Sequence, residues 1–212
     1  MAKNAIIFGD SYSTFDGYVP EGYPVYYSET SHSELGVNCA SNTWWYQMAT
    51  EADLHLVRND SWSGSTIGYT GYQGDCSHSS SFIYRLRKLE QEGFFEQNVI
   101  DTVLVFGGTN DSWSNAPLGK LKLNDFEEQD LYNVLPAIAD FFYEIKRILP
   151  QATVYCLINL GLKPEIADAF ERVCHRYGIT KVVFDDIHKV DGHPTAQGMR
   201  DIKAAVVRAL CN

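Results

Sequence analysis

The sequence predicts an α/β fold in which a parallel sheet is covered by helices on both faces. Short apolar runs typical of buried strands alternate five times with longer segments whose apolar residues recur at helical spacing. The chain has 212 residues, 45% of them hydrophobic and 21% charged, which suits one globular domain. We therefore expect a single domain over residues 1–212, with an aromatic-rich loop insertion at about 18–42.

The first elements are a strand, a helix and a second strand. Residues 5–8 form an apolar run that stops at a glycine, which predicts a buried strand. A helical pattern follows over 42–53, with Ser41 or Asn42 as the expected N-cap residue. Residues 54–57 are predicted as the second strand.

The middle of the chain continues the alternation. Residues 79–91 carry apolar side chains at helical spacing. Residues 102–106 are rich in β-branched side chains and are stopped by two glycines, so they give the strongest strand signal in the chain. Residues 131–149 form a long amphipathic pattern that Pro150 ends.

The last part of the chain holds two more pairs of elements. An apolar run predicts a strand at 153–158, and a helical pattern follows over 164–177. A final strand is expected at 181–184 and a final helix at 195–210. In parallel sheets of this kind, ligands bind beyond the carboxyl ends of the strands, so functional side chains are expected directly after the strands.

Charge and composition limit the classes of partner. The formal net charge is −10, and the 17 lysines and arginines are scattered along the sequence, so we expect neither nucleic acid nor an anionic membrane as a partner. No apolar run approaches the ~20 residues of a membrane-spanning helix. No signal peptide is recognised at the start, which predicts a cytoplasmic protein. The five cysteines are odd in number and lack CxxC spacing, which predicts neither a disulfide framework nor a zinc ribbon.

Four residues that suit acyl-transfer chemistry follow predicted strands. Ser11 would present a hydroxyl at the sheet edge, and Gly64 would let a backbone N–H approach a ligand. Asn110 offers an amide N–H for an oxyanion, and His193, followed by Pro194, suits a fixed base. Taken singly, each is also explained as a turn or capping residue.

Together these residues resemble the SGNH hydrolases, the GDSL-type esterases and lipases named for a Ser, Gly, Asn and His in this order. The resemblance rests on four blocks that extend from residue 9 to residue 194, namely 9–11, 59–64, 108–111 and 191–194. It implies a flavodoxin-like three-layer α/β/α sandwich with a five-stranded parallel sheet. It also implies hydrolysis of esters through an acyl-enzyme, without a cofactor or a metal.

The resemblance also implies a role for each residue. Ser11 is expected to be the nucleophile and His193 the general base. The oxyanion hole is expected to consist of the backbone N–H groups of Ser11 and Gly64 and the Asn110 amide.

One block departs from the family pattern. The family places an Asp three residues before the His, and here that position is Val190. Asp191, two residues before His193, is our preferred third catalytic residue, with the Val190 carbonyl or Asp186 as alternatives for orienting the ring.

The substrate prediction rests on aromatic residues in the loops after the first two strands, with Trp113 added from the loop after the third. Tyr12, Trp62 and Trp113 are expected to bind the substrate, whereas Trp44 and Trp45 fall on a predicted helix and are expected in the core. Aromatic rings with polar tips suit a sugar or aryl ester, so we expect a small-molecule substrate with a short acyl group, such as acetyl on a carbohydrate.

Two other classes of function stay open at this point. The same fold and aromatic loops suit a catalytically silent carbohydrate-binding domain. A metal-dependent phosphoesterase would use Asp186, His188, Asp191 and His193 as ligands. Thioesterases and acyltransferases use the same machinery as esterases, and the sequence leaves the oligomeric state open.

Overall fold

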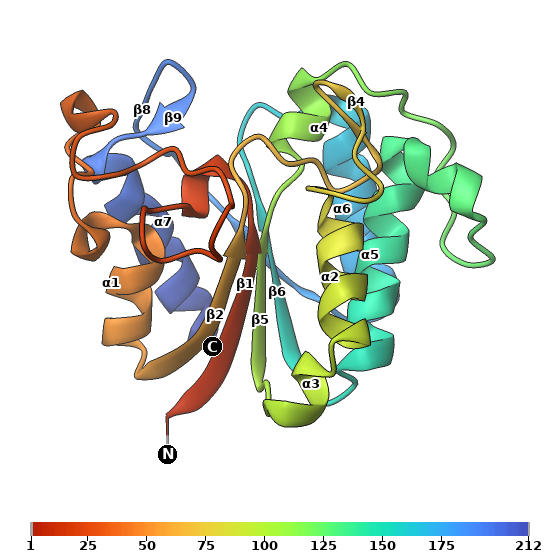
Figure 1. Cartoon of the computed structure of the whole chain (residues 1–212), viewed down its shortest axis with the longest axis horizontal. Helices are drawn as coiled ribbons and strands as arrows, with labels where there is room; N and C mark the ends of the chain where they lie inside the picture. Colours follow the sequence, from red (N-terminus) through yellow and green to blue (C-terminus); the bar gives the residue numbers. More distant parts are fainter. Residues whose placement is uncertain (1, 212) are drawn as a thin grey trace.

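The centre of the molecule is a five-stranded parallel sheet. The computed structural model describes residues 2–211, and Figure 1 shows the sheet nearly edge-on between two layers of helices. The strands lie in the order β2-β1-β5-β6-β7, each parallel to its neighbours, which is the order of flavodoxin-like sheets. Their bounds are β1 Lys3–Gly9, β2 Leu54–Ser61, β5 Thr102–Phe106, β6 Thr153–Ile158 and β7 Thr180–Val183. The predicted fold class is thus confirmed.

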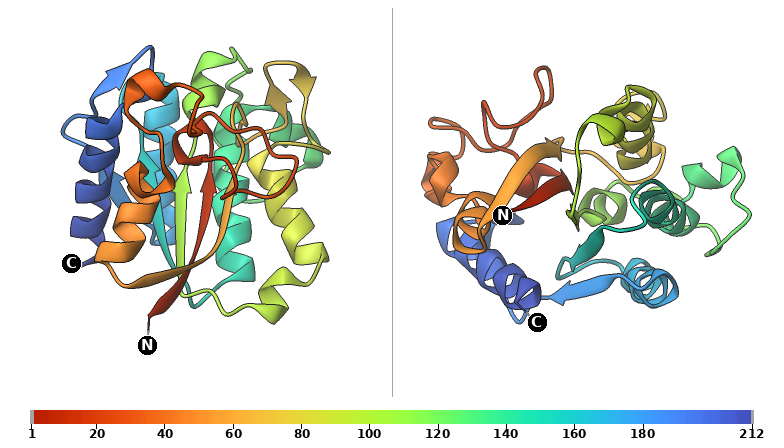
Figure 2. Two further views of the ribbon diagram at one scale, coloured as in Figure 1. Left: turned by 60° about the vertical axis from the view of Figure 1, so that its left-hand side comes forward. Right: turned by 90° about the horizontal axis from the view of Figure 1, so that it is seen from below.

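Helices cover both faces of this sheet, as Figures 1 and 2 show. Helices α1 (Trp44–Glu51) and α7 (Ala196–Leu210) cover one face, and α2 (Phe82–Gln91), α5 (Val134–Ile148) and α6 (Pro164–Tyr177) cover the other. Successive side chains of a strand point to opposite faces, and Ile6 and Ile7 of β1 accordingly enter different hydrophobic cores. Each such side chain contributes about 1.5–3 kcal/mol by leaving water, so the apolar runs of the sequence become the buried strands.

Two predicted boundaries are corrected by local contacts. The N-cap of α1 is Thr43, whose hydroxyl accepts the Tyr46 N–H at 3.4 Å, because residues 40–42 form a separate 3-10 turn. Strand β2 continues to Ser61 although its last residues are polar. Asp60 is buried there in an ion pair, so the strand extends beyond the apolar pattern that predicted only 54–57. The other predicted elements match within a few residues, and Trp44 and Trp45 lie in the core as predicted.

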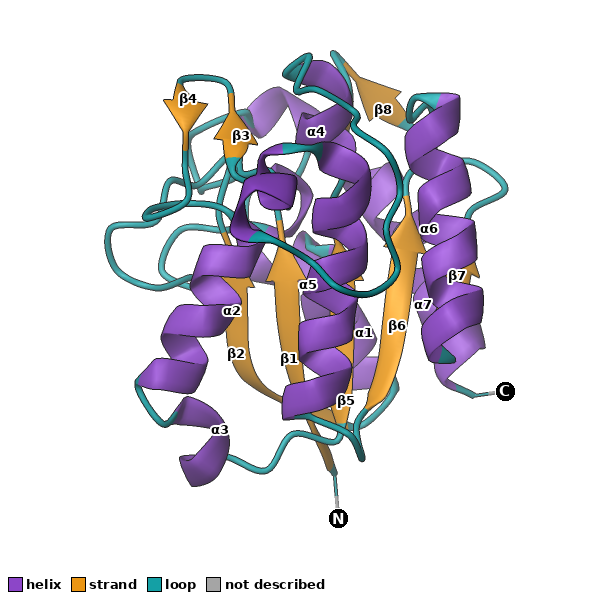
Figure 3. Cartoon of the chain, turned by 90° about the vertical axis from the view of Figure 1, so that its right-hand side faces the viewer, coloured by secondary structure: helices purple, strands orange, loops and turns teal. Residues whose placement is uncertain are grey.

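Small elements gather where the parallel strands end. Figure 3 shows the strands pointing toward two short hairpins and helix α4. The bounds of the small elements are β3 Thr70–Gly71, β4 Gly74–Asp75, β8 Lys189–Val190, β9 His193–Pro194, α3 Phe94–Gln97 and α4 Thr109–Trp113. The remaining 3-10 turns are Ser11–Ser13, Ser33–Leu35, Ala40–Asn42 and Glu128–Tyr132.

The long segment between β1 and α1 folds onto the body beside the carboxyl end of the sheet (Figure 2). Leu35 and Val37 are buried in the same core as α1 and α7. Tyr27 is also buried, and its hydroxyl donates a hydrogen bond of 2.7 Å to the carbonyl of Pro194. The segment is therefore fastened directly to the hairpin that contains His193.

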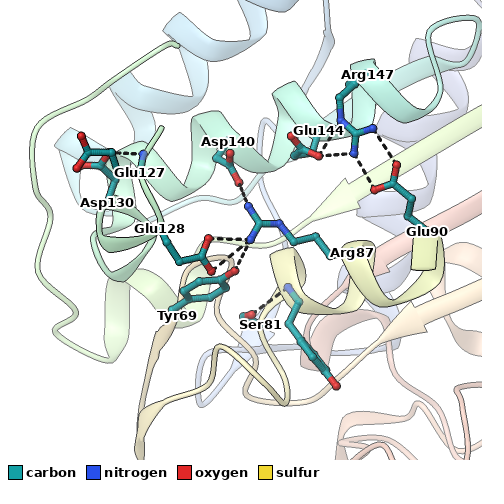
Figure 4. Close-up of polar contacts among 11 residues, drawn as sticks. Tyr69, Ser81, Arg87, Glu90, Glu127, Glu128, Asp130, Asp140, Glu144 and Arg147 are labelled. Carbon is teal, nitrogen blue, oxygen red and sulfur yellow. Dashed lines mark hydrogen bonds and ion pairs between the residues drawn. The ribbon is translucent and has the colours of Figure 1, made fainter. Parts of the chain in front are cut away.

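Polar contacts join α2 and α5 on the other face (Figure 4). Arg87 on α2 contacts Glu128 at 3.0 Å and Asp140 at 3.4 Å, and Arg147 on α5 contacts Glu90 at 2.7 Å. The pair of Arg147 with Glu90 is largely exposed, and pairs of that kind contribute about 0–1 kcal/mol. Asp140 is only 3% exposed, so Arg87 partners a carboxylate that would otherwise be buried without a counter-charge.

Within residues 2–211, every helix is too short or too polar to cross a bilayer. All five cysteines are free thiols.

Candidate active site

Ser11 and His193 meet at the carboxyl end of the sheet. The Ser11 Oγ lies 3.1 Å from the His193 Nε2, although 182 positions separate the two residues in sequence. Ser11 begins the 3-10 turn that follows β1, and His193 begins strand β9. This distance is within hydrogen-bond reach, as transfer of the hydroxyl proton to the imidazole requires.

The other ring nitrogen of His193 faces a main-chain carbonyl. Its Nδ1 lies 3.3 Å from the backbone oxygen of Asp191. A carbonyl oxygen only accepts hydrogen bonds, so this contact places the proton on Nδ1 and leaves the Nε2 lone pair facing Ser11. The contact therefore selects the tautomer that a general base needs.

The expectation that the carboxylate of Asp191 orients the ring is therefore corrected. Asp191 and Gly192 form the turn between β8 and β9, with φ values of +48° and +79° that are typical of a tight type I′ hairpin turn. The Asp191 residue is exposed, and its carbonyl rather than its carboxylate faces the imidazole. The two alternatives for orienting the ring are Asp186 and the Val190 carbonyl. The Asp186 carboxylate accepts a hydrogen bond from the Ile187 N–H at 2.8 Å. Val190 is the strand partner of His193 in the hairpin.

The three aromatic residues expected to bind substrate have different environments. Tyr12 is only 1% exposed and its hydroxyl donates to the Gly192 carbonyl, so it supports the hairpin and is closed to a substrate. Trp113 is 44% exposed, with its ring 6.2 Å from that of His193. Trp62 is half-buried and packs against Tyr23 at 4.5 Å. Of these three residues, Trp113 is therefore the one with an exposed ring next to His193.

Asn110, near the start of α4, has its amide fixed at both ends. Its Nδ2 donates to the Ser65 carbonyl at 2.9 Å, and its Oδ1 accepts from the Tyr72 hydroxyl at 3.1 Å. An amide nitrogen carries two hydrogens, so these contacts use only one of its N–H bonds. The two contacts also define which way the amide faces.

Gly64 lies in the loop that follows β2. Its φ of +81° belongs to the left-handed region that glycine adopts without strain, and a Cβ placed there would meet no atom within 4 Å. The conformation of the backbone, rather than crowding, therefore explains glycine at this position. The exposed main chain at Gly64 is open to a ligand.

A buried ion pair that the sequence analysis missed fastens the loops after β1 and β2. Arg85 on α2 is 1% exposed and lies 2.6 Å from the Asp60 carboxylate. It also donates to the Gly9 carbonyl at 3.3 Å and to the Ser65 hydroxyl at 3.2 Å. The only sign of this ion pair in the sequence is Arg85 itself, a charged residue among the apolar positions of the predicted helix 79–91.

Buried carboxyl groups lie beneath the site. Asp111 accepts hydrogen bonds from the N–H groups of Ile67 and Gly68, which fixes the path of the chain after Gly64. Burial raises the pKa of Asp111 to about 6, against the lowering effect of these bonds. Burial likewise raises the pKa of Asp10, directly before Ser11, to about 7.

The electrostatic environment of His193 favours the neutral imidazole. Burial is the main cause that lowers its pKa, and the nearby charges of His32 and Lys189 lower it further. The hydrogen bond to the Asp191 carbonyl acts in the opposite direction. A histidine with a lowered pKa is unprotonated near neutral pH, so it is ready to accept a proton.

The proposed metal ligands do not gather into a site. Across residues 2–211, no three His, Cys, Asp or Glu side chains are grouped so that they could hold a metal ion. The Nδ1 of His188 lies 2.7 Å from the Thr195 hydroxyl, and the Asp186 carboxylate accepts the N–H of the next residue. The metal-dependent phosphoesterase hypothesis therefore has no cluster of ligands to support it.

A hydroxyl paired with an imidazole at the carboxyl end of a parallel sheet is typical of enzymes that transfer acyl groups. The sequence agrees with this class, because the profile of the family described as GDSL-like lipase/acylhydrolase matches residues 3–210. The chain belongs to this family and is a hydrolase of esters. The resemblance predicted from the four sequence blocks is thus confirmed.

Solved structures give the same family assignment. A protein assigned as a GDSL-like lipase from Bacteroides uniformis is 38% identical with a TM-score of 0.90, over 99% of this chain and 96% of that one. Another from Bacteroides ovatus is 36% identical with a TM-score of 0.89, over 97% and 96%. An acetyl xylan esterase from Butyrivibrio proteoclasticus shares the fold at 16% identity and a TM-score of 0.61, over 98% of this chain and 63% of that one. No curated protein matches the sequence.

Proposed function

We propose that this protein is a serine esterase that hydrolyses carboxylic esters through an acyl-enzyme, with Ser11 as nucleophile and His193 as general base. The observation that carries the proposal is the 3.1 Å contact between the Ser11 Oγ and the His193 Nε2. The Asp191 carbonyl orients the imidazole from its other side. The catalytic unit is therefore a serine–histidine pair supported by the main chain.

In the first half of the reaction, Ser11 attacks the ester carbonyl while His193 accepts the hydroxyl proton. The negative charge that develops on the carbonyl oxygen is met by the backbone N–H groups of Ser11 and Gly64 and by the second N–H of Asn110. Each donor of this kind typically lowers the barrier by about 3 kcal/mol.

In the second half, the imidazolium of His193 protonates the departing alcohol, which leaves the acyl group on Ser11. Water then attacks the acyl-enzyme and gives its proton to His193. Collapse of this second intermediate releases the acid, and the proton returns from His193 to the Ser11 oxygen. No cofactor or metal enters any of these steps.

A short acyl group on a carbohydrate is the proposed substrate. Trp113 offers an exposed ring near His193, and aromatic faces stack well on sugar rings. The acetyl xylan esterase that shares this fold suggests the same substrate class, although its low identity supports only the fold. A silent carbohydrate-binding domain would use the same aromatic residues, but it would not need a serine hydroxyl hydrogen-bonded to an imidazole.

The test is hydrolysis of p-nitrophenyl acetate by the wild type and by Ser11→Ala and His193→Ala, each with and without EDTA. We expect turnover by the wild type, loss of nearly all activity in both variants and no effect of EDTA. Acetylated xylo-oligosaccharides and esters of longer acids then define the substrate. Full activity in Ser11→Ala would remove the nucleophile assignment, and a wild type that binds sugars but cleaves no ester would favour the binding domain.

A further inference from the structure

Three aromatic rings from distant parts of the chain form one stack at the active site. The Tyr26 ring lies 3.6 Å from that of His193, with an angle of 5° between their planes. On its other face, Tyr26 lies 3.8 Å from the ring of His32, at an angle of 4°. Tyr26 is therefore sandwiched between two histidines, one of which contacts Ser11.

The geometry of this stack suits a positively charged His193. Two neutral aromatic rings prefer an offset or edge-on arrangement to a centred face-to-face one. A cation over the face of a tyrosine ring is attracted by the negative π face. His193 becomes a cation when it accepts the Ser11 proton, so the contact with Tyr26 strengthens as the reaction proceeds.

The main chain fastens Tyr26 to the nucleophile turn. The Tyr26 N–H donates to the Thr14 hydroxyl at 2.9 Å, and that hydroxyl donates to the Ser11 carbonyl at 3.0 Å. The next residue, Tyr27, donates from its side chain to the Pro194 carbonyl. Tyr26 is thus positioned relative to both Ser11 and His193. A displacement of Tyr26 would therefore change the position of His193 relative to Ser11.

His193 needs such a support because its other restraints do not lie against the face of the ring. Tyr12 and Trp113 meet the ring edge-on, with ring centroids 5.5 and 6.2 Å away. Its hairpin has only two residues in each strand, and the Asp191 carbonyl offers one hydrogen bond of 3.3 Å. That bond sets the tautomer but does not fix the plane of the ring, because rotation about the last torsion of histidine is broad. A parallel ring against its face does fix the plane.

We infer that Tyr26 is a positioning residue that holds the His193 ring in the plane required for proton transfer, a role that a carboxylate fills in other serine hydrolases. His32 packs on the far face of Tyr26 and keeps it against His193. The inference rests on the proposed serine mechanism. The charged groups around the stack are Glu34, whose carboxylate is 3.4 Å from the His32 Nδ1, and Lys189 and Asp191 beside His193.

The experiment measures labelling of Ser11 by a fluorophosphonate probe, which needs no knowledge of the natural ester, together with kcat and KM for p-nitrophenyl acetate. For Tyr26→Leu we expect labelling and kcat to fall by about 10- to 100-fold, with KM changed by less than about twofold, because misplacement of a catalytic group affects the reacting atoms rather than ground-state binding. Tyr26→Phe keeps the ring, so both rates should remain within about threefold of wild type.

The matched control is Tyr18→Leu. Tyr18 belongs to the same segment and packs against Phe15 and Trp45 instead of His193. Its loss should leave labelling and kcat unchanged. A general loosening of the segment would instead lower the rates of both leucine variants.

His32→Asn gives a second measurement that does not depend on folding of Tyr26→Leu, because His32 is exposed and asparagine tolerates its φ of +55°. We expect labelling to fall by about two- to fivefold, the value of a contact at an exposed aromatic face. Wild-type rates in Tyr26→Leu would overturn this inference and leave the proposed function unaffected. If the leucine variant does not fold, wild-type rates in His32→Asn would do the same. A wild type that is neither labelled nor active would overturn the proposed function and this inference together.

Discussion

The two halves of the candidate active site are held in place by different kinds of contact. The loops after β1 and β2, which contain Ser11 and Gly64, are fastened by the ion pair between Arg85 and Asp60, both of which are almost completely buried. His193 lies half-exposed on a small hairpin and is held by one main-chain carbonyl and by contacts with aromatic rings, of which that of Tyr26 is face-on.

This difference shows where the molecule is sensitive to change. Removing one partner of a buried ion pair leaves an uncompensated charge and costs about 3–5 kcal/mol. An aromatic or cation–π contact contributes about 0.5–2 kcal/mol. We therefore expect mutations on the nucleophile side to affect folding as well as activity, and mutations on the histidine side to affect activity more than folding.

Among variants that keep both Ser11 and His193, the largest effect is expected at Asn110. Asn110→Ala removes a donor from the proposed oxyanion hole, so kcat for p-nitrophenyl acetate should fall by about 10²- to 10³-fold. Tyr72→Phe, which removes only the hydroxyl that fixes the amide, should lower kcat by less than about tenfold. Equal rates in wild type and Asn110→Ala would exclude Asn110 from oxyanion stabilisation.

The buried network can be tested by folding. Arg85→Met should lower the free energy of unfolding by about 3–5 kcal/mol in denaturant titrations, because Asp60 loses its fully buried partner. Arg58 also contacts Asp60, at 2.7 Å, but its side chain is partly exposed. Arg58→Met should therefore cost less than about 1 kcal/mol. Similar losses in the two variants would contradict the difference in burial that distinguishes these ion pairs.

The pH dependence of kcat/KM reports on His193 in the free enzyme. The base must be neutral, and its pKa is lowered chiefly by burial, so activity should be lost only as pH falls through a value below 6.5. Lys189→Met removes a positive charge that lowers this pKa, and it should move the acid limb to higher pH. A wild-type limb at or above pH 6.5 would show that His193 is not in the desolvated environment described above.

Among residues that contact His193, the smallest effect is expected for Asp191→Asn. Asparagine tolerates the positive φ at this position and keeps the backbone carbonyl that faces His193. We expect kcat/KM within about threefold of wild type, whereas replacing the carboxylate of a true triad by an amide typically lowers kcat by about 10⁴-fold. A loss of that size would restore the carboxylate as the group that orients the ring.

Local patterns predicted much of this molecule. The β-branched residues at 102–106 and the amphipathic pattern at 195–210 are signals carried by neighbours in sequence, and the structure has a strand and a helix there. The parallel sheet then follows from the alternation of such elements, and its carboxyl edge brings Ser11 and His193 together. The predicted second strand stopped at residue 57 because the polarity of Asp60 conceals the end of β2, where the buried carboxylate is paired with Arg85, 25 positions further along the chain.

The sequence by itself determined the fold class, the family and the order of Ser11, Gly64, Asn110 and His193 along the chain, because hydrophobic periodicity and short motifs are local properties. Only the tertiary structure decided how His193 is held. The choice between the carbonyl and the carboxylate of Asp191 depends on the two-residue turn of a hairpin. The stack of Tyr26 depends on a contact between segments more than 150 positions apart, and no pattern of neighbouring residues specifies such a contact.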